Sequence, residues 1–95
     1  NGISVNGDGK NDGFVIEGIE HYPNNTLKIF NRWGVLVYEK EHYNNRDPFV
    51  GISNGRVTVS KETKLPQGTY YYVLEYTDLK GNHQKKSGWL YIKVN

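Results

Sequence analysis

The chain lacks cysteine and methionine, and each absence limits what it can be. None of its 95 residues is cysteine or methionine. Without cysteine it has no disulfide framework and no thiolate metal site, which suits a reducing compartment and equally a secreted protein of a lineage that does without disulfides. Because a complete translation product begins with methionine and this sequence begins with Asn1, we expect a fragment of a larger protein. A missing signal peptide therefore excludes nothing.

Long apolar runs are missing as well. No stretch approaches the ~20 apolar residues of a membrane helix, so we expect no direct membrane insertion, and no segment repeats apolar residues at the helical period. Short runs rich in β-branched and aromatic residues instead alternate with clusters of Gly, Asn, Asp and Pro. They predict strands at 14–19, 26–33, 35–41, 56–60, 69–77 and 88–94. We therefore expect one all-β domain over 1–95, an immunoglobulin-like antiparallel β-sandwich of about seven strands.

Residues 65–95 predict the longest hairpin of the chain, around a turn at Gly81-Asn82 that tolerates a positive φ angle. In its second strand, alternation places Leu90 and Ile92 on one face and Trp89 and Tyr91 on the other. Core packing and cross-strand pairing explain most aromatic residues. An exposed stripe of Trp89 and Tyr91 would instead suit protein docking or sugar stacking. Both interpretations stay open.

Charge is distributed unevenly along the chain. Residues 1–78 hold 8 Lys/Arg and 10 Asp/Glu, whereas residues 79–95 hold no acidic residue and four lysines, Lys80, Lys85, Lys86 and Lys93. Such lysines keep a terminal hairpin soluble, and they also suit an acidic partner surface. Because they are few and no arginine accompanies them, we do not expect nucleic acid as a partner.

The segment 4–12, SVNGDGKND, resembles part of a calcium loop. Such loops carry oxygen ligands at alternate positions and a glycine at the sixth. Counted from position 4, the third, fifth, seventh (through its carbonyl) and ninth positions hold, in order, Asn6, Asp8, Lys10 and Asp12. A carboxylate at the first position, the bidentate Glu at the twelfth and a following helix are missing. An ion-free loop of Asx-turns explains the same residues, so bound Ca²⁺ is one of two interpretations and no cofactor is required.

Nothing in the sequence supports catalysis. The three histidines, at 21, 42 and 83, lie in different predicted turns, and no two have the spacing of metal ligands. No G-x-S-x-G nucleophile elbow is present. Glu39 and Glu41 lie two apart on one predicted strand face, as solvated side chains do. We therefore expect a protein that is not an enzyme.

Five motifs, in order along the chain, resemble those of one known family. The family's P-N-G-D-G-x-N-D corresponds to residues 5–12, I-x-N-R-W-G-x-x-V-Y-E to 29–39, Y-x-N to 43–45, L-P-x-G-T-Y-Y-Y to 65–72 and G-x-x-Y-I to 88–92. On these residues the chain resembles the gliding-motility-associated C-terminal domain, the type B sorting domain of the Bacteroidetes type IX secretion system. Two positions depart from the pattern. Val5 replaces the opening proline, and Phe49-Val50-Gly51 replaces W-D-G and removes an acidic residue.

The resemblance implies a sorting signal rather than an enzyme. Domains of this kind sit at the C-terminus of large exported adhesins and enzymes and direct them through the outer-membrane translocon to the cell surface. Type B domains are paired with an outer-membrane β-barrel of the PorP/SprF kind, so translocon components and such a barrel are the implied partners. We expect the contact residues on the terminal hairpin: Lys85, Lys86, Trp89, Tyr91 and Lys93. The alternative is a carbohydrate- or calcium-binding immunoglobulin-like module of an extracellular protein.

Overall fold

The structure is a computed structural model that describes residues 4–6, 13–52 and 64–92. Its elements follow in the order β1 (Ser4–Asn6), β2 (Val15–Glu17), η1 (Ile19–His21, a 3-10 turn), β3 (Asn25–Phe30), β4 (Leu36–Glu41), β5 (Gly68–Thr77) and β6 (His83–Ile92). All strand pairs are antiparallel. The described chain is therefore all-β, as its composition predicts.

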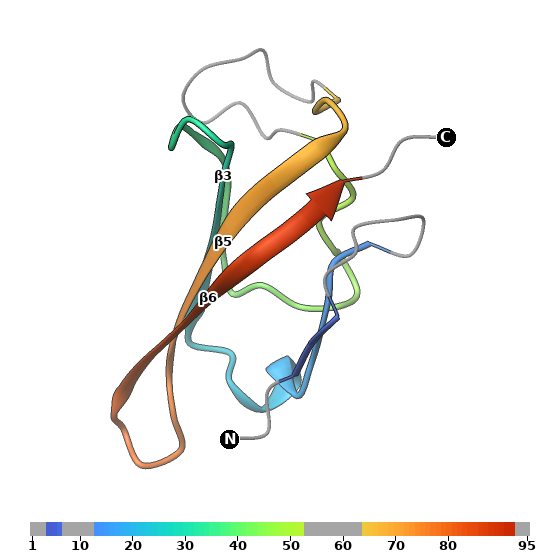
Figure 1. Ribbon diagram of the computed structural model, residues 1–95. Coiled ribbons are helices and arrows are strands. Elements are labelled where there is room, and N and C mark those ends of the chain that lie inside the picture. Colours follow the sequence, from blue (N-terminus) through green and yellow to red (C-terminus); the bar gives the residue numbers. More distant parts are fainter. Residues whose placement is uncertain (1–3, 7–12, 53–63, 93–95) are drawn as a thin grey trace.

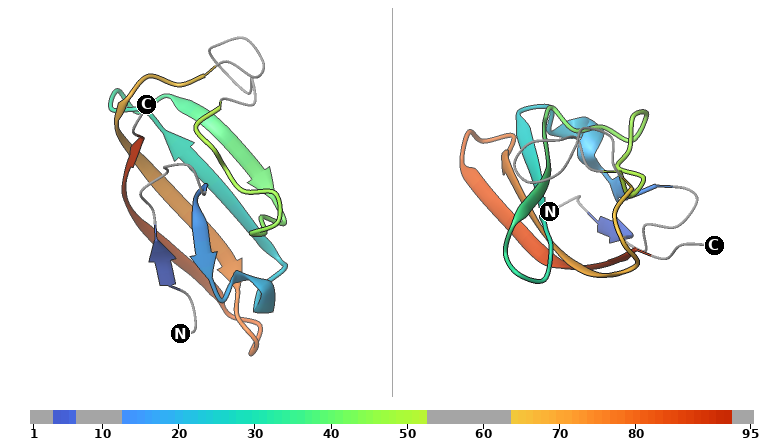
Figure 2. Two further views of the ribbon diagram at one scale, coloured as in Figure 1. Left: turned by 90° about the vertical axis from the view of Figure 1, so that its right-hand side faces the viewer. Right: turned by 90° about the horizontal axis from the view of Figure 1, so that it is seen from above.

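The strands form two sheets. The larger has the order β4-β3-β5-β6, and the smaller pairs β1 with β2. Figures 1 and 2 show the β1–β2 pair on one face of the larger sheet. In the larger sheet β5 and β6 pair along their whole length, from Gly68 opposite Ile92 to Thr77 opposite His83. This long hairpin confirms the predicted one.

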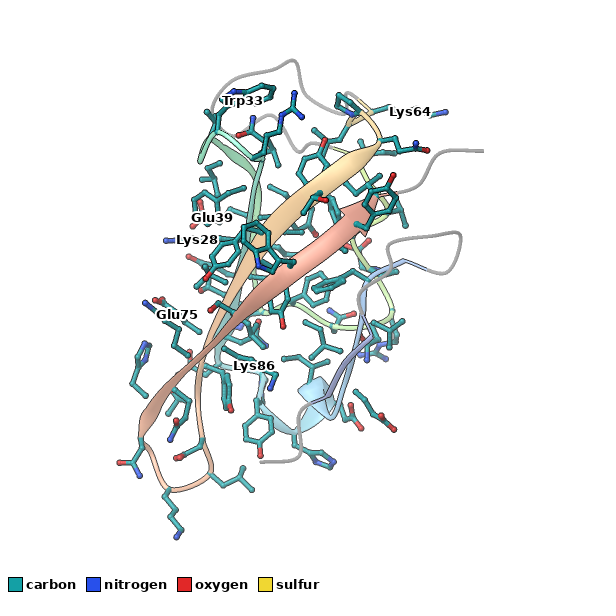
Figure 3. All side chains as sticks on the ribbon, in the orientation of Figure 1. Lys28, Trp33, Glu39, Lys64, Glu75 and Lys86 are labelled. Atoms are coloured by element: carbon teal, nitrogen blue, oxygen red, sulfur yellow. The ribbon has the colours of Figure 1, made fainter. Side chains whose placement is uncertain are left out.

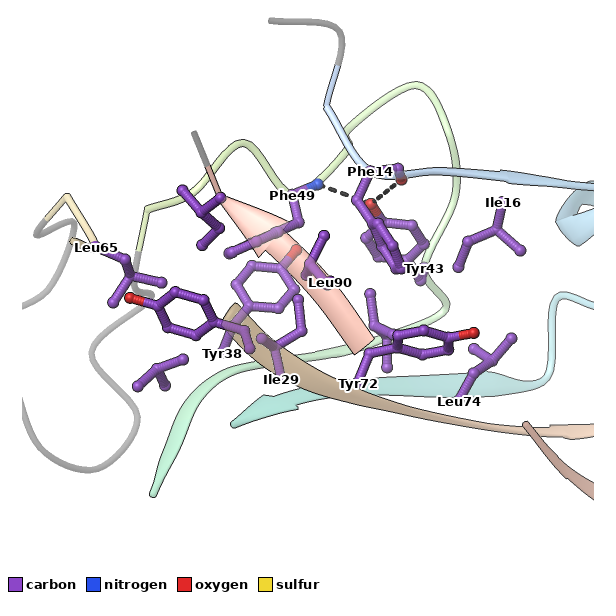
Figure 4. Close-up of a cluster of buried hydrophobic side chains, with 14 of the residues drawn as sticks. Phe14, Ile16, Ile29, Tyr38, Tyr43, Phe49, Leu65, Tyr72, Leu74 and Leu90 are labelled. Carbon is purple, nitrogen blue, oxygen red and sulfur yellow. Dashed lines mark hydrogen bonds between the residues drawn. The ribbon is translucent and has the colours of Figure 1, made fainter. Parts of the chain in front are cut away.

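The core lies between the two sheets. Because successive side chains of a strand point to opposite faces, β3, β5 and β6 each bury every second residue over the part of the sheet that the core covers, and β2 and the loop 43–52 close the other side (Figure 4). The fully buried side chains are Phe14, Ile16, Ile19, Leu27, Ile29, Tyr43, Phe49, Leu74 and Leu90. Gly88 lies opposite Tyr72, and a Cβ on it would come within 3.0 Å of the Tyr72 ring. Glycine at this strand position makes room for a core aromatic residue.

Several predicted element boundaries are wrong, each for a local reason. The segment 1–13, expected as a loop, contains β1, and the strand expected at 14–19 ends at Glu17 because Gly18 adopts a positive φ of 92° before η1. The strand expected at 26–33 ends at Phe30, where a turn begins. The last strand begins at His83 rather than at Gly88, because its pairing with β5 continues to the hairpin turn.

The alternation expected in β4 is also wrong at one point. The register between β3 and β4 shifts after Ile29, which lies opposite Tyr38, while Phe30 lies opposite Leu36. Val37 is the extra residue of this bulge, so Val37 and Tyr38 are both buried instead of facing opposite sides. The adjacent apolar pair Ile29-Phe30 predicts that its own strand is either buried on both faces or bulged. The structure shows neither, because β3 alternates regularly and the extra residue lies on β4.

The immunoglobulin-like sandwich of about seven strands is not confirmed. The described residues form six strands, in sheets of four and two. The strand expected at 56–60 lies outside the described residues. The confirmed part of the prediction is the all-β class with an antiparallel sheet.

Candidate partner-binding surface

The last strand presents two faces of different character. On one face Leu90 and Ile92 are buried in the core. On the other face Trp89 is 68% exposed and Tyr91 47% exposed. The predicted alternation is confirmed, and it leaves two large aromatic side chains on the side of the sheet turned away from the core.

Trp89 belongs to an aromatic row that crosses the larger sheet. The register places Trp89 opposite Tyr71 and Tyr71 opposite Phe30. The rings of Tyr71 and Trp89 meet edge to face with centroids 4.9 Å apart, an arrangement that aromatic pairs prefer. Together with Tyr91 these residues form a surface that we call the outer aromatic face: Phe30, Tyr71, Trp89 and Tyr91.

The predicted lysines do not gather on this face. Lys85 lies opposite Glu75 and shares the side of Trp89, about 13 Å along the strand at ~3.3 Å per residue. Lys86 lies opposite Leu74 and therefore points to the other side of the sheet; Figure 3 shows Glu75 and Lys86 on either side of the hairpin.

The strand expected at 88–94 leaves Lys85 and Lys86 in the preceding turn, and this placement is wrong. Both residues lie within β6, and the turn is formed by residues 78–82, with Gly81 at a φ of 88°. Lys93, the third predicted lysine, lies outside the described residues. Of the four predicted contact residues that the structure describes, Lys85, Trp89 and Tyr91 share one side of the sheet and Lys86 points to the other.

Within the described residues, β6 and β4 are the two edges of the larger sheet. β4 has six residues and ends in three consecutive charged ones, Glu39, Lys40 and Glu41. β6 has ten residues, and its second part, 87–92, carries no charge. Because short length and charge discourage pairing at an edge, the edge of β6 is the less protected of the two.

Residues 31–35 form a turn that displays two large side chains. The Asn31 Oδ1 atom accepts hydrogen bonds from the backbone N–H groups of Trp33 (2.9 Å) and Val35 (3.0 Å). Gly34 completes the turn at a φ of 81°, a conformation that costs glycine little. Between them Trp33 is 72% exposed, and the Arg32 guanidinium carbon lies 4.3 Å from the centroid of its ring. The first and last residues of N-R-W-G thus build the turn, and the middle two are exposed to solvent. Figure 3 shows Trp33 at this end of the sheet.

Arg32 lines two open cavities. The first, of about 320 Å³, separates the 31–33 turn from residues 66–70. The second, of about 400 Å³, lies on the outer aromatic face, where it is lined by Phe30, Tyr71, Val73 and Trp89 beside the turn. The sequence interpretation missed this site, although the signal was present: an Asn-x-x-Gly turn with Arg and Trp between its two structural residues.

The Y-x-N motif has a structural role. The Tyr43 hydroxyl donates to the Phe14 carbonyl (2.6 Å) and accepts from the Phe49 N–H (2.7 Å), so it joins β2 to the loop that covers the core (Figure 4). Burial raises the pKa of Tyr43 above its ordinary value, and the hydrogen bond from Phe49 acts against that rise. The Asn45 side chain bonds both backbone groups of Ile16. These contacts account for the motif without any partner.

The candidate calcium segment falls mostly outside the described residues. Asp8, Lys10 and Asp12 are not described, and of Asn6 only the backbone is, as the last residue of β1. Within 13–52 and 64–92, no group of three or more His, Cys, Asp or Glu side chains is placed to hold a metal ion. In the same part of the chain no helix has the length and apolar character needed to cross a membrane.

Comparison with known proteins identifies one family. The family model of the type IX secretion signal domain, CHU_C, matches residues 1–92. No curated protein and no solved structure gives a significant match. The match spans both the N-R-W-G turn and the terminal hairpin.

Proposed function

The chain belongs to the type IX secretion signal domain family, and on that premise we propose that an outer-membrane β-barrel of the PorP/SprF kind holds it, with its cargo, at the cell surface. Family membership itself establishes the coarser role. Such a domain is a non-catalytic sorting module that addresses a secreted cargo to the type IX machinery and so to the cell surface. The cargo in this proposal is a large surface protein such as an adhesin.

The observation that carries the proposal is the combination of an unprotected edge and exposed aromatic residues on β6. A partner strand added to this edge would form backbone hydrogen bonds and cover Trp89 and Tyr91 in the same step. At about 25 cal/mol per Å² of apolar surface, covering the exposed parts of the two rings contributes on the order of 3 kcal/mol. Lys85 lies on the same side but directly opposite Glu75, so its charge adds little to the proposal.

A reporter fusion tests the proposal in a bacterium that has the type IX system. The chain is fused to a fluorescent protein, and the surface-bound and released fractions are measured. We expect the double variant Trp89→Ala, Tyr91→Ala to shift the reporter from the cell surface to the medium, as deletion of the barrel protein does. Leu79→Ala is the matched control, because Leu79 is 80% exposed in the hairpin turn and lies off the outer aromatic face. Unchanged surface display of a folded double variant would contradict the proposal.

Sugar binding is a second candidate function, and one specific observation favours it. Sugar rings stack on exposed aromatic side chains, and Trp89 and Tyr91 lie two residues apart on the same side of β6. A glycan array probed with the purified chain, followed by titration of its tryptophan fluorescence, decides this candidate. If no glycan on the array binds and the double variant releases the reporter, Trp89 and Tyr91 contact the sorting partner and not a sugar.

A further inference from the structure

Arg32 and the two cavities that it lines form a site centred on the 31–35 turn, and this site shares Trp89 with the outer aromatic face of β6. We propose that this site binds an extended acidic segment of a partner protein, with a carboxylate on Arg32 and an apolar side chain in each cavity. The identity of the partner, a component of the type IX machinery, rests on the proposed function. The binding itself rests on the geometry of the turn and the charge of the site.

The turn holds Arg32 and Trp33 in place before any partner arrives. Besides the two hydrogen bonds to Asn31 Oδ1, the Gly34 N–H donates to the Asn31 carbonyl, and the Asn31 N–H donates to the Val35 carbonyl (both 2.9 Å). An indole that is 72% exposed adds little to the core. A turn that holds a tryptophan side chain in water leaves a large apolar surface unburied, and a partner that covers this surface would recover the free energy of burial. Exposed aromatic residues beside arginine are also typical of binding hot spots.

Among the residues that the structure describes, the charge of the site is positive and no carboxylate is paired with it. Of the described residues that line the two cavities, Arg32 is the only charged one. No carboxylate of the described residues forms an ion pair with Arg32, whereas Lys40 pairs with Asp47 at 3.1 Å. The positive charge of Arg32 also extends to Tyr70, where it lowers a pKa that burial raises. A guanidinium stacked on an indole still directs its N–H groups outward in its own plane, and a carboxylate is the group that matches them.

Arg32 lines both cavities, so an extended chain that crosses Arg32 has access to both. Alternate residues of such a chain point the same way, about 6.6 Å apart, so the pattern apolar-x-acid-x-apolar places one side chain in each cavity and the acid on Arg32. The cavity on the outer aromatic face is lined mainly by apolar side chains, those of Phe30, Tyr71, Val73 and Trp89. Sugar hydroxyls would lose water there with few groups to replace it, which favours a protein segment over a saccharide.

Peptide titration of the 95-residue chain tests the inference. The probe is acetyl-Phe-Ser-Asp-Ser-Leu-amide, and its two controls replace Asp with Asn or with Lys. Binding is followed by the indole N–H signals in ¹⁵N NMR spectra, since the chain has only two tryptophans. We expect the Asp peptide to bind at least five-fold more tightly than the Asn peptide, with a preference that declines as salt is added.

Two variants distinguish a specific role of Arg32 in peptide binding from the effect of any nearby positive charge. Arg32→Gln is expected to abolish the five-fold preference for Asp over Asn while the rest of the spectrum stays that of the folded chain. Lys64→Gln is the matched control, because Lys64 is an exposed cation at the same end of the sheet (Figure 3) that lines neither cavity. The preference should survive in that variant.

Several outcomes would overturn the inference. These are equal affinity for the Asp and Asn peptides, a preference that survives Arg32→Gln, or tighter binding of oligogalacturonate than of the Asp peptide with the same dependence on Arg32. The last result would assign the site to an acidic saccharide. The reporter fusion gives a separate result. If the peptide preference depends on Arg32 while the surface display of the Trp89/Tyr91 variant is unchanged, the proposed function is contradicted and the inference about Arg32 is not.

Discussion

The side-chain amide of Asn45 makes the two hydrogen bonds to Ile16 that a neighbouring strand would make. Its Oδ1 accepts from the Ile16 N–H and its Nδ2 donates to the Ile16 carbonyl, both at 2.9 Å. The N–H and C=O of one strand residue point to the same side, so the amide occupies the side of β2 away from β1. One residue of the 43–52 loop thus continues the smaller sheet and attaches it to the larger one.

Replacing this amide with a carboxylate should loosen that attachment. Asn45→Asp keeps an acceptor for the Ile16 N–H but loses the donor and sets a negative charge beside the Ile16 carbonyl. We expect the free energy of unfolding to fall by about 1–3 kcal/mol in urea titrations. Asn44→Asp is the control: Asn44 Oδ1 accepts from the N–H groups of Arg46 and Asp47, and its Nδ2 donates only a long, exposed hydrogen bond of 3.4 Å to the His42 carbonyl. Its change should stay within about 0.5 kcal/mol. Equal losses in both variants would contradict the strand-like role of Asn45.

Removal of the Tyr43 hydroxyl should lower the free energy of unfolding by more than the loss of one small group suggests. Tyr43→Phe leaves the Phe14 carbonyl and the Phe49 N–H without the partner they share in the core. We expect a loss of about 2–4 kcal/mol in the free energy of unfolding, because unpaired buried polar groups keep their full desolvation cost. The matched variant is Tyr71→Phe, whose hydroxyl bonds Ser87 Oγ at the surface, and we expect less than about 1 kcal/mol there. A similar small loss in both would mean that water replaces the hydroxyl of Tyr43.

Alkaline pH should destabilise the fold through Tyr38. Burial, with a smaller contribution from the charge of Asp47, raises the pKa of Tyr38 from 10.0 to about 12. The folded chain therefore holds this proton more tightly than the unfolded chain, and the stability that results is present below pH 10 and declines from pH 10 towards 12. Denaturant unfolding measured between pH 8 and 12 should decline less steeply in Tyr38→Phe. Identical slopes in the two proteins would exclude this cause.

Acid should loosen the β5–β6 hairpin through Asp78. The pKa of Asp78 is lowered, first by the hydrogen bond from the Asn82 N–H and next by the Gln84 side chain. Because the pKa of Asp78 is lower in the folded chain than in the unfolded chain, its ionisation stabilises the fold at pH values above the unfolded pKa of about 3.8. This stabilisation is lost as the pH falls through the pKa of the folded chain. Asp78→Asn should therefore have a lower melting temperature than the parent at pH 7, with the gap closing below pH 3. A gap that persists at pH 2 would point to a cause other than ionisation.

The segment 6–12 can be tested for calcium without knowledge of its geometry. Bound Ca²⁺ at 100 times its Kd would stabilise the chain by about 2.7 kcal/mol, so the calcium interpretation predicts a melting midpoint that rises with CaCl₂ and returns with EGTA. Asp8→Ala, Asp12→Ala should abolish that rise. An unchanged midpoint in the parent chain assigns the segment to the ion-free loop.

Much of the fold follows from local alternation. The pattern in 69–77 and 88–92 correctly separates core from surface, because the pleat of a strand imposes a period of two. The start of β6 was missed because Gln84, Lys85 and Lys86 have weak strand preference by themselves and are ordered by pairing with β5. That Lys85 and Lys86 point to opposite faces of the sheet was missed for the same reason, because neighbouring side chains point to opposite faces in a strand but not in a turn.

The sequence by itself determined the family, the all-β class, the terminal hairpin and the placement of Trp89 and Tyr91 on the face opposite Leu90 and Ile92. Each of these depends on motifs or on alternation within short segments. The tertiary structure alone decided that the N-R-W-G turn lies beside residues 66–70 and beside Trp89. That neighbourhood follows from the register in which Phe30 lies opposite Tyr71 and Tyr71 opposite Trp89. Strand order and register are set by packing between distant segments, which no local pattern encodes.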